Sequence, residues 1–124
     1  MSDSLSKIPI RVTVVDRGEA RGVLNRLTAP LTVEDILKRL PVNTRTSTSV
    51  GFVSIIVGIR RGTEKPVTRM EAGTIGYWPR GDALCIYTRD TITQGPVNRV
   101  GEIREGIELF QGLRSGSRII IERA

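Results

Sequence analysis

The chain has 124 residues, a formal net charge of +6 and 39% hydrophobic side chains, which fits one globular domain over residues 1–124. No apolar run approaches the roughly 20 residues needed to cross a bilayer, and one cysteine excludes an internal disulfide. The absence of histidine excludes a histidine-based triad and most zinc sites, and no phosphate-binding glycine loop occurs, so we expect no metal and no cofactor.

The positive charge raises the question of nucleic acid, because phosphate neutralisation supplies most non-specific affinity. The basic residues are spread from Lys7 to Arg123, and no run of aromatic residues forms a stacking surface. We therefore expect no nucleic-acid binding. The segment Met1–Lys7 is short and polar and lacks the apolar core of a signal peptide, so we interpret it as a frayed start and expect a cytoplasmic protein with no membrane contact.

The first elements form a hairpin. In Ile8–Val14, aliphatic residues alternate with polar ones or proline, which is typical of a strand with one buried face. Asp16–Glu19 is a turn signal, and Ala20–Leu27 can return as the second strand.

The one convincing helix is Ala29–Leu40. Thr32 can cap it, Asp35 approximates the acid of a capping box, and Leu31 and Ile36 are spaced for a hydrophobic staple. One apolar stripe runs along the helix, formed by Val33, Ile36, Leu37 and Leu40. We expect this stripe to pack on a sheet, because nearly everything after it has the pattern of strands and turns.

The remainder of the chain predicts short strands separated by glycine and proline turns. Val42–Ser49 is extended or looped, Arg89–Pro96 is a loop, and Glu108–Leu113 is a single helical turn. The predicted strands are Phe52–Ile59, Val67–Met70, Ala83–Thr88, Val97–Ile103 interrupted by Gly101, and Arg118–Glu122. Strands at this spacing favour a small barrel or sandwich.

The segment Gly73–Thr88 contains the only tryptophan, both tyrosines and the only cysteine. Gly76, Pro79 and Gly81 predict a loop in its middle, since proline fixes φ and glycine permits positive φ. The strand after this loop carries Cys85.

Cys85 lies between Leu84 and Ile86, which predicts a small buried hydrophobic side chain and not a reactive thiol. Asp82 and Asp90 flank the same strand, and a carboxylate pair can in principle perform acid-base chemistry. We interpret them as two solvated turn residues.

Two stretches carry a family resemblance. GTIGYWPRGDALCI at Gly73–Ile86 and PVNRVG at Pro96–Gly101 resemble the cyclophilin-like family, in particular its small stand-alone bacterial and archaeal branch. The resemblance implies a mainly β fold, a closed small β-barrel of cyclophilin-like type with one main α-helix packed across an end.

The similarity to the prolyl isomerases of that family implies that their pocket residues have changed. The residues that this resemblance places at isomerase pocket positions are Ser54 at the catalytic arginine, Ile59 and Cys85 at phenylalanines, Gly62 and Ala83 at glutamines, Val97 at the histidine, and Ile92 near the tryptophan. Neither Ser54 nor Val97 can donate as guanidinium or imidazole would. We expect no appreciable prolyl isomerisation, and whether the protein is an enzyme stays open, leaning toward no.

The leading functional hypothesis is therefore a peptide-binding or small-ligand-binding domain. A peptidyl-prolyl cis-trans isomerase and a subunit of a larger enzyme assembly are the alternatives. Tyr77 and Trp78 can line a groove or fill the core, since large aromatic residues are more often buried than exposed.

If a ligand site exists, we expect it where the turn Tyr77–Asp82 meets the turn formed by Arg60 and Arg61. The candidate residues are Arg60, Arg61, Tyr77, Trp78 and Arg80. Guanidinium groups suit bidentate recognition of a carboxylate or phosphate, so the expected partner is a peptide or small molecule with an anionic group. The alternative is that the arginines point apart and pair with Glu64 or Asp82.

Overall fold

The computed structural model describes residues 6–124 and confirms mainly β structure with one substantial helix. Of the predicted frayed start, residues 1–5 lie outside the described part, and Lys7 is the first residue of β1. The elements are β1 (Lys7–Val14), β2 (Gly18–Asn25), α2 (Pro30–Arg39), β3 (Val42–Arg45), β4 (Ser47–Ser49), β5 (Phe52–Ile56), β6 (Val67–Met70), β7 (Thr74–Trp78), the 3-10 turn η1 (Pro79–Gly81), β8 (Ala83–Tyr87), β9 (Thr91–Glu105), η2 (Ile107–Phe110) and β10 (Arg118–Arg123).

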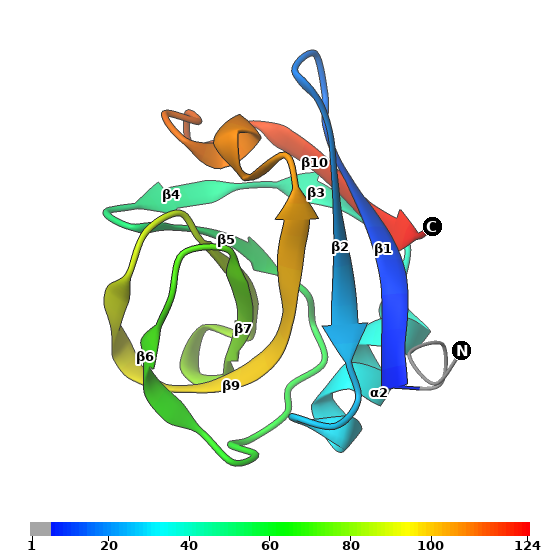
Figure 1. Ribbon diagram of the computed structural model, residues 1–124, viewed down its shortest axis with the longest axis vertical. Coiled ribbons are helices and arrows are strands. Elements are labelled where there is room, and N and C mark those ends of the chain that lie inside the picture. Colours follow the sequence, from blue (N-terminus) through cyan, green and yellow to red (C-terminus); the bar gives the residue numbers. More distant parts are fainter. Residues whose placement is uncertain (1–5) are drawn as a thin grey trace.

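The strands curve round one another in the order β3-β10-β1-β2-β9-β7-β8-β5-β4, with β6 paired to β9 beside this path (Figure 1). The two ends of the order, β3 and β4, are consecutive in sequence and separated only by Thr46. The amide of Thr46 donates to Ser117 O, and its carbonyl accepts from Gly116 N. No ladder joins β3 to β4, so the sheet is not closed by hydrogen bonds and the predicted closed barrel is not confirmed.

The predicted hairpin at the start of the chain is confirmed. β1 and β2 pair antiparallel from Lys7 with Asn25 to Val14 with Gly18, around a turn in which Asp16 adopts a φ of 68°. Alternate β1 residues are buried, as the period-two pattern predicted. β10 pairs on the other side of β1, as expected for a closing strand.

The helix is also confirmed, but its predicted capping is wrong. α2 begins at Pro30, a favoured first helical residue, and Ala29 at the N-cap makes no side-chain hydrogen bond. Leu31 is 57% exposed, so there is no staple, whereas Thr32 is completely buried. In residues 6–124 no helix is long and apolar enough to cross a membrane.

Four other predictions are corrected. Arg89–Pro96 is not a loop, since β9 begins at Thr91, and Gly101 does not interrupt this strand. Gly76 is inside β7 and not in a turn; a Cβ there would lie 2.6 Å from Val97 Cγ1, so glycine is required for packing. The strand predicted at Phe52–Ile59 ends at Ile56.

The buried side chains form two clusters. The main core lies between α2 and the inner face of the sheet, where Val33, Ile36 and Leu37 pack. A second cluster lies where β6 and the first part of β9 cover the outer face of β7 and β8; its members are Met70, Cys85, Tyr87 and Val97, with Phe52, Val67 and Trp78 packed against them. Cys85 is fully buried and has no disulfide partner, as predicted.

We predict that Ile36→Ala lowers the free energy of unfolding by about 2–5 kcal/mol, because Ile36 is completely buried between helix and sheet. Leu31→Ala on the exposed side of the same helix serves as the matched control and should change it by less than about 0.5 kcal/mol. Urea denaturation of the two variants gives both values. Equal effects would show that the stripe does not seal the core.

Candidate functional site

Tyr77, one of the predicted ligand residues, is completely buried in the main core. Its hydroxyl donates to Asp82 Oδ1 at 2.7 Å and accepts from the amide of Arg61 at 3.1 Å. Burial raises the pKa of Tyr77 to about 12, and the hydrogen bond to the Asp82 carboxylate acts in the same direction. Tyr77 therefore fixes the structure beneath the predicted site.

Asp82 organises the adjacent loop and is not a solvated turn residue. It adopts a left-handed conformation at the end of η1, with φ 49°. Besides the Tyr77 hydroxyl, its Oδ1 accepts the amides of Ile59 at 3.0 Å and Arg60 at 2.9 Å. One carboxylate thus holds the start of the segment between β5 and β6, which has no ladder of its own.

The three predicted arginines differ in their contacts. Arg61 donates from Nε and Nη2 to Asp35 Oδ2, each at 2.7 Å, so its partner is neither Glu64 nor Asp82. The side chains of Arg60 and Arg80 are exposed, and neither forms an ion pair within residues 6–124. Anion binding by these residues stays a prediction.

A partly buried hydrogen-bond network that the sequence did not reveal holds the other end of the segment. Glu64 reaches back to α2, where its carboxylate accepts the amides of Leu31 at 3.1 Å and Thr32 at 2.9 Å. It also accepts the Thr32 hydroxyl at 2.7 Å. A carboxylate at a helix N-terminus accepts hydrogen bonds from the unpaired amides there and interacts favourably with the positive end of the helix dipole. The helix is therefore capped by Glu64, a residue distant in sequence.

Asn98 completes this network from the middle of β9. Its side chain is completely buried; Oδ1 accepts the amide of Glu64 at 2.7 Å, and Nδ2 donates to Gly62 O at 3.0 Å and to Thr32 Oγ1 at 3.2 Å. The side-chain amide of Asn98 therefore links β9 by hydrogen bonds to α2 and to the segment after β5.

Trp78 is half-buried and packs against the second cluster. Its ring lies over Gly81, where a Cβ would be 2.4 Å from Cε3. The indole nitrogen is buried and has no acceptor in the described part of the chain. The side chain thus belongs to the outer face of the sheet, and Tyr77 to the inner face.

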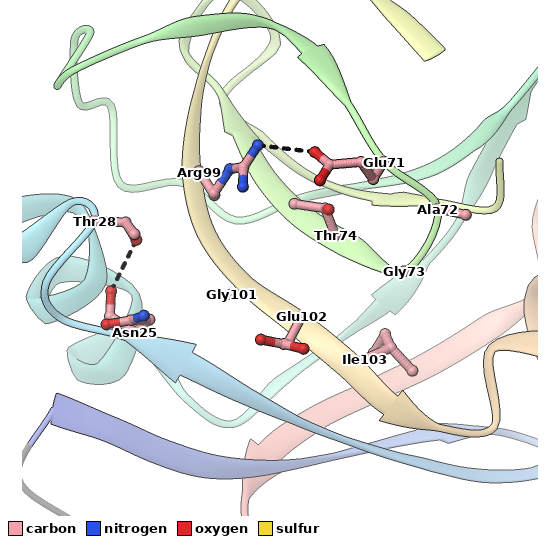
Figure 2. A pocket seen from close by; sticks show the side chains of 10 residues that line it. All are labelled: Asn25, Thr28, Glu71, Ala72, Gly73, Thr74, Arg99, Gly101, Glu102 and Ile103. Atoms are coloured by element: carbon pink, nitrogen blue, oxygen red, sulfur yellow. Dashed lines mark hydrogen bonds and ion pairs between the residues drawn. The ribbon is translucent and has the colours of Figure 1, made fainter. Parts of the chain in front are cut away.

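An open, polar pocket of 330 Å³ lies on another part of the outer face (Figure 2). In Figure 2 the side chains of Arg99 and Glu71 point toward each other, and their ion pair measures 3.0 Å from Nη2 to Oε1. Asn25 and Thr28 lie together at one side of the pocket, and Glu102 lies below the Arg99–Glu71 pair in this view. The pocket is lined by Asn25, Thr28, Glu71, Ala72, Gly73, Thr74, Arg99, Gly101, Glu102 and Ile103.

A bulge in β9 directs the charged residues into this pocket. Thr74 pairs with Glu102, and Gly76 pairs with Arg99, so the register shifts by one residue between them. Residues three positions apart on a regular strand face opposite sides, but here both partners share the face of Thr74 and Gly76. The extra residue, Val100, is completely buried in the main core. The bulge thereby places a guanidinium and a carboxylate on one surface.

The described part of the chain offers no candidate metal site. In residues 6–124 no group of three or more cysteine, aspartate or glutamate side chains could hold an ion.

Comparison with protein families matches residues 7–122 to the family described as Cyclophilin-like. A hypothetical protein from Archaeoglobus fulgidus, AF2241, has a solution structure with a TM-score of 0.79 and 22% identity, covering 96% of each chain. McbB, solved in complex with tryptophan, has a TM-score of 0.76 and 14% identity, covering 92% of this chain and 44% of its own. At these identities, the two similarities show a shared fold and nothing more. A comparison with curated proteins gives no match.

We predict that Asp82→Ala lowers the free energy of unfolding by about 2–4 kcal/mol, because it leaves the buried Tyr77 hydroxyl and two amides without their acceptor. Asp82→Asn keeps an acceptor oxygen and tolerates the left-handed conformation, so its effect should be markedly smaller. Denaturant unfolding measures both. Equal losses would contradict the role of the carboxylate as an acceptor.

The pH dependence of stability tests the helix cap. Burial raises the pKa of Glu64, but hydrogen bonds from Thr32 and Leu31 and the nearby Arg61 outweigh it, so the pKa lies below its ordinary value of 4.5. A depressed pKa contributes stability that is present above the unfolded-state pKa and is lost as pH falls through the folded-state pKa. We expect Glu64→Gln to reduce the loss of stability on acidification below 4.5. Glu108→Gln, at an exposed site, serves as control, and equal acid profiles for the two variants would contradict this cap.

Proposed function

The chain belongs to the cyclophilin-like family, and from the pocket on its outer face we propose that it is a binding domain for a small zwitterion of the α-amino acid class, without efficient prolyl isomerase activity. The observation that carries the proposal is the β9 bulge, which turns Arg99 and Glu102 toward the same cavity. Bulges often re-aim side chains beside functional sites.

The lining offers partners for both charges of such a ligand. Within residues 6–124 the Arg99 guanidinium makes one hydrogen bond, from Nη2 to Glu71, so its remaining donors can bind a carboxylate. Asn25 accepts the amide of Leu27 through Oδ1, which leaves its own amide hydrogens to assist. The carboxylate of Glu102 has no hydrogen-bond or ion-pair partner among the described residues and can receive the ammonium.

The balance of charge favours a ligand that includes a cation. The pocket holds the two carboxylates of Glu71 and Glu102 against the one guanidinium of Arg99, while the chain as a whole carries +6. A local reversal of sign attracts an ammonium group that the rest of the surface repels. A simple anion fits this lining less well than a zwitterion does.

The size and exposure of the pocket fit a small ligand. Its 330 Å³ is near the lower end of the range of about 300–1,000 Å³ for small-molecule sites. The side chains of Arg99 and Glu71 are 40% and 67% exposed, and an exposed ion pair contributes at most about 1 kcal/mol, so a ligand can rearrange it at little cost. The tryptophan in the McbB complex is an amino acid, which is compatible with this ligand class.

The outer face of β5 and β8 supports the second part of the proposal. Ser54 pairs with Cys85 there, and Ala83 pairs with Ile56. These side chains offer a hydroxyl, a thiol and hydrocarbon, with no guanidinium among them. They cannot supply the donor on which isomerase catalysis is expected to depend.

We predict that L-leucine shifts the amide resonances of Thr74, Arg99 and Glu102 in protein NMR, because both of its charges find partners in the pocket. 4-Methylpentanoate keeps only the carboxylate and isoamylamine only the ammonium, so each should bind at least about tenfold more weakly, a difference of about 1.4 kcal/mol. Raising the salt concentration should weaken the leucine response, since exposed charges are screened. Equal binding of the three compounds would contradict a site for a zwitterion.

Two substitutions localise the effect. Glu102→Gln removes a pocket carboxylate and should weaken leucine binding about tenfold, whereas Glu105→Gln changes an exposed carboxylate on the same strand outside the lining. Unchanged affinity in Glu102→Gln, or equal losses in both variants, would exclude this pocket as the site.

A further inference from the structure

Three side chains at the outer face and in the ribbon over it bury polar atoms that have no hydrogen-bond partner within residues 6–124. They are the indole nitrogen of Trp78, the hydroxyl of Tyr87 and both polar atoms of the Gln94 amide. Unpaired buried groups are costly and rare in native proteins, and each requires an explanation. Tyr87 is completely buried, so solvent does not satisfy its hydroxyl.

These groups surround the second cluster. Tyr87 is a member of it, and Trp78 packs against it. Burial raises the pKa of Cys85 to about 11, while the neighbouring Tyr87 hydroxyl and Gln94 amide act in the opposite direction, although neither contact reaches hydrogen-bond geometry. The Tyr87 hydroxyl and the Gln94 amide therefore lie beside one thiol, and Trp78 packs against the same cluster.

The layer that covers them has few strand partners. Within residues 6–124, β6 pairs with β9 alone, and residues 91–97 of β9 pair only with β6 (Figure 1). This two-stranded ribbon breaks register between Val67 and Arg69, opposite the segment that contains Gln94. Two-stranded ribbons are marginally stable in isolation, and such elements open locally at lower free energy than the whole fold.

The edge of the ribbon already gives access toward the cluster. A surface pocket of 230 Å³ is lined by Met70, a buried member of the cluster, together with Arg69, Glu71, Asp90, Thr91 and Ile92. Methionine is flexible and readily changes its packing. Movement of the Met70 side chain would connect this pocket to the unpaired groups.

We propose that the ribbon formed by β6 and residues 91–97 of β9 opens as a flap and admits a small neutral molecule with an amide-like donor and acceptor. The Gln94 amide pairs with both groups of such a ligand, and Tyr87 or Trp78 donates to its carbonyl. The members of the cluster itself are uncharged, so the site between them favours a neutral molecule over a charged one, which would lose its hydration on entering. This site is separate from the pocket in Figure 2 and does not rest on the function proposed for it.

Thiol labelling of the intact protein tests the opening, because Cys85 is the only cysteine and lies beneath the ribbon. We expect methyl methanethiosulfonate to label Cys85 at least about tenfold faster than global unfolding allows, with little dependence on urea, as local opening requires. Benzamide, a planar amide, should slow the labelling saturably. Benzoate has the same shape with a charge and should not.

Two glutamine substitutions provide the matched comparison. Gln94→Leu removes the unpaired amide, so it should abolish protection by benzamide and slow the opening, since an apolar group replaces a buried polar one. Gln111→Leu changes an exposed residue and should behave like the unmodified protein. Labelling that follows global unfolding with the same urea dependence, or labelling that benzamide leaves unchanged, overturns the proposal.

Discussion

The structure depends on the pairing of β9 with three different strands. Its first part pairs with β6, its middle with β7 and its last part with β2, so one 15-residue strand joins the outer ribbon to the main sheet. A bulge at Val100, within the pairing with β7, places Arg99 and Glu102 on one face. From the centre of the same strand, Asn98 holds the segment that carries Glu64 to the helix. Fold and candidate site therefore share one constraint.

The sequence predicted elements whose signals are local. The β1–β2 hairpin, the stripe of α2 and the closing strand β10 all follow from residues close in sequence. Errors arose where distant residues decide the outcome. Thr32 is a residue type that commonly caps helices, but here the Glu64 carboxylate accepts the first helix amides, and Thr32 itself is buried inside the helix. Gly95 and Pro96 suggested a loop, but they lie in the first part of β9, where the irregular pairing with β6 accommodates them.

The site was less predictable for the same reason. Arg61 and Tyr77 have the chemistry of ligand residues, yet Asp35 and Asp82 take up their donors. Arg99 and Glu102 carry no motif, and only the register against β7 shows that they face the same cavity. A one-residue shift reverses the face of every following side chain, so a pocket of this kind cannot be identified from alternation alone.

The most direct measurement of the central claim is the set of intermolecular NOEs between L-leucine and the labelled protein. The β9 bulge account predicts NOEs from the ligand methyl groups to the methyl groups of Thr74, Ala72 and Ile103, which line the cavity beside Arg99 and Glu102. NOEs to Trp78 instead, or none under conditions where leucine is bound, would contradict it.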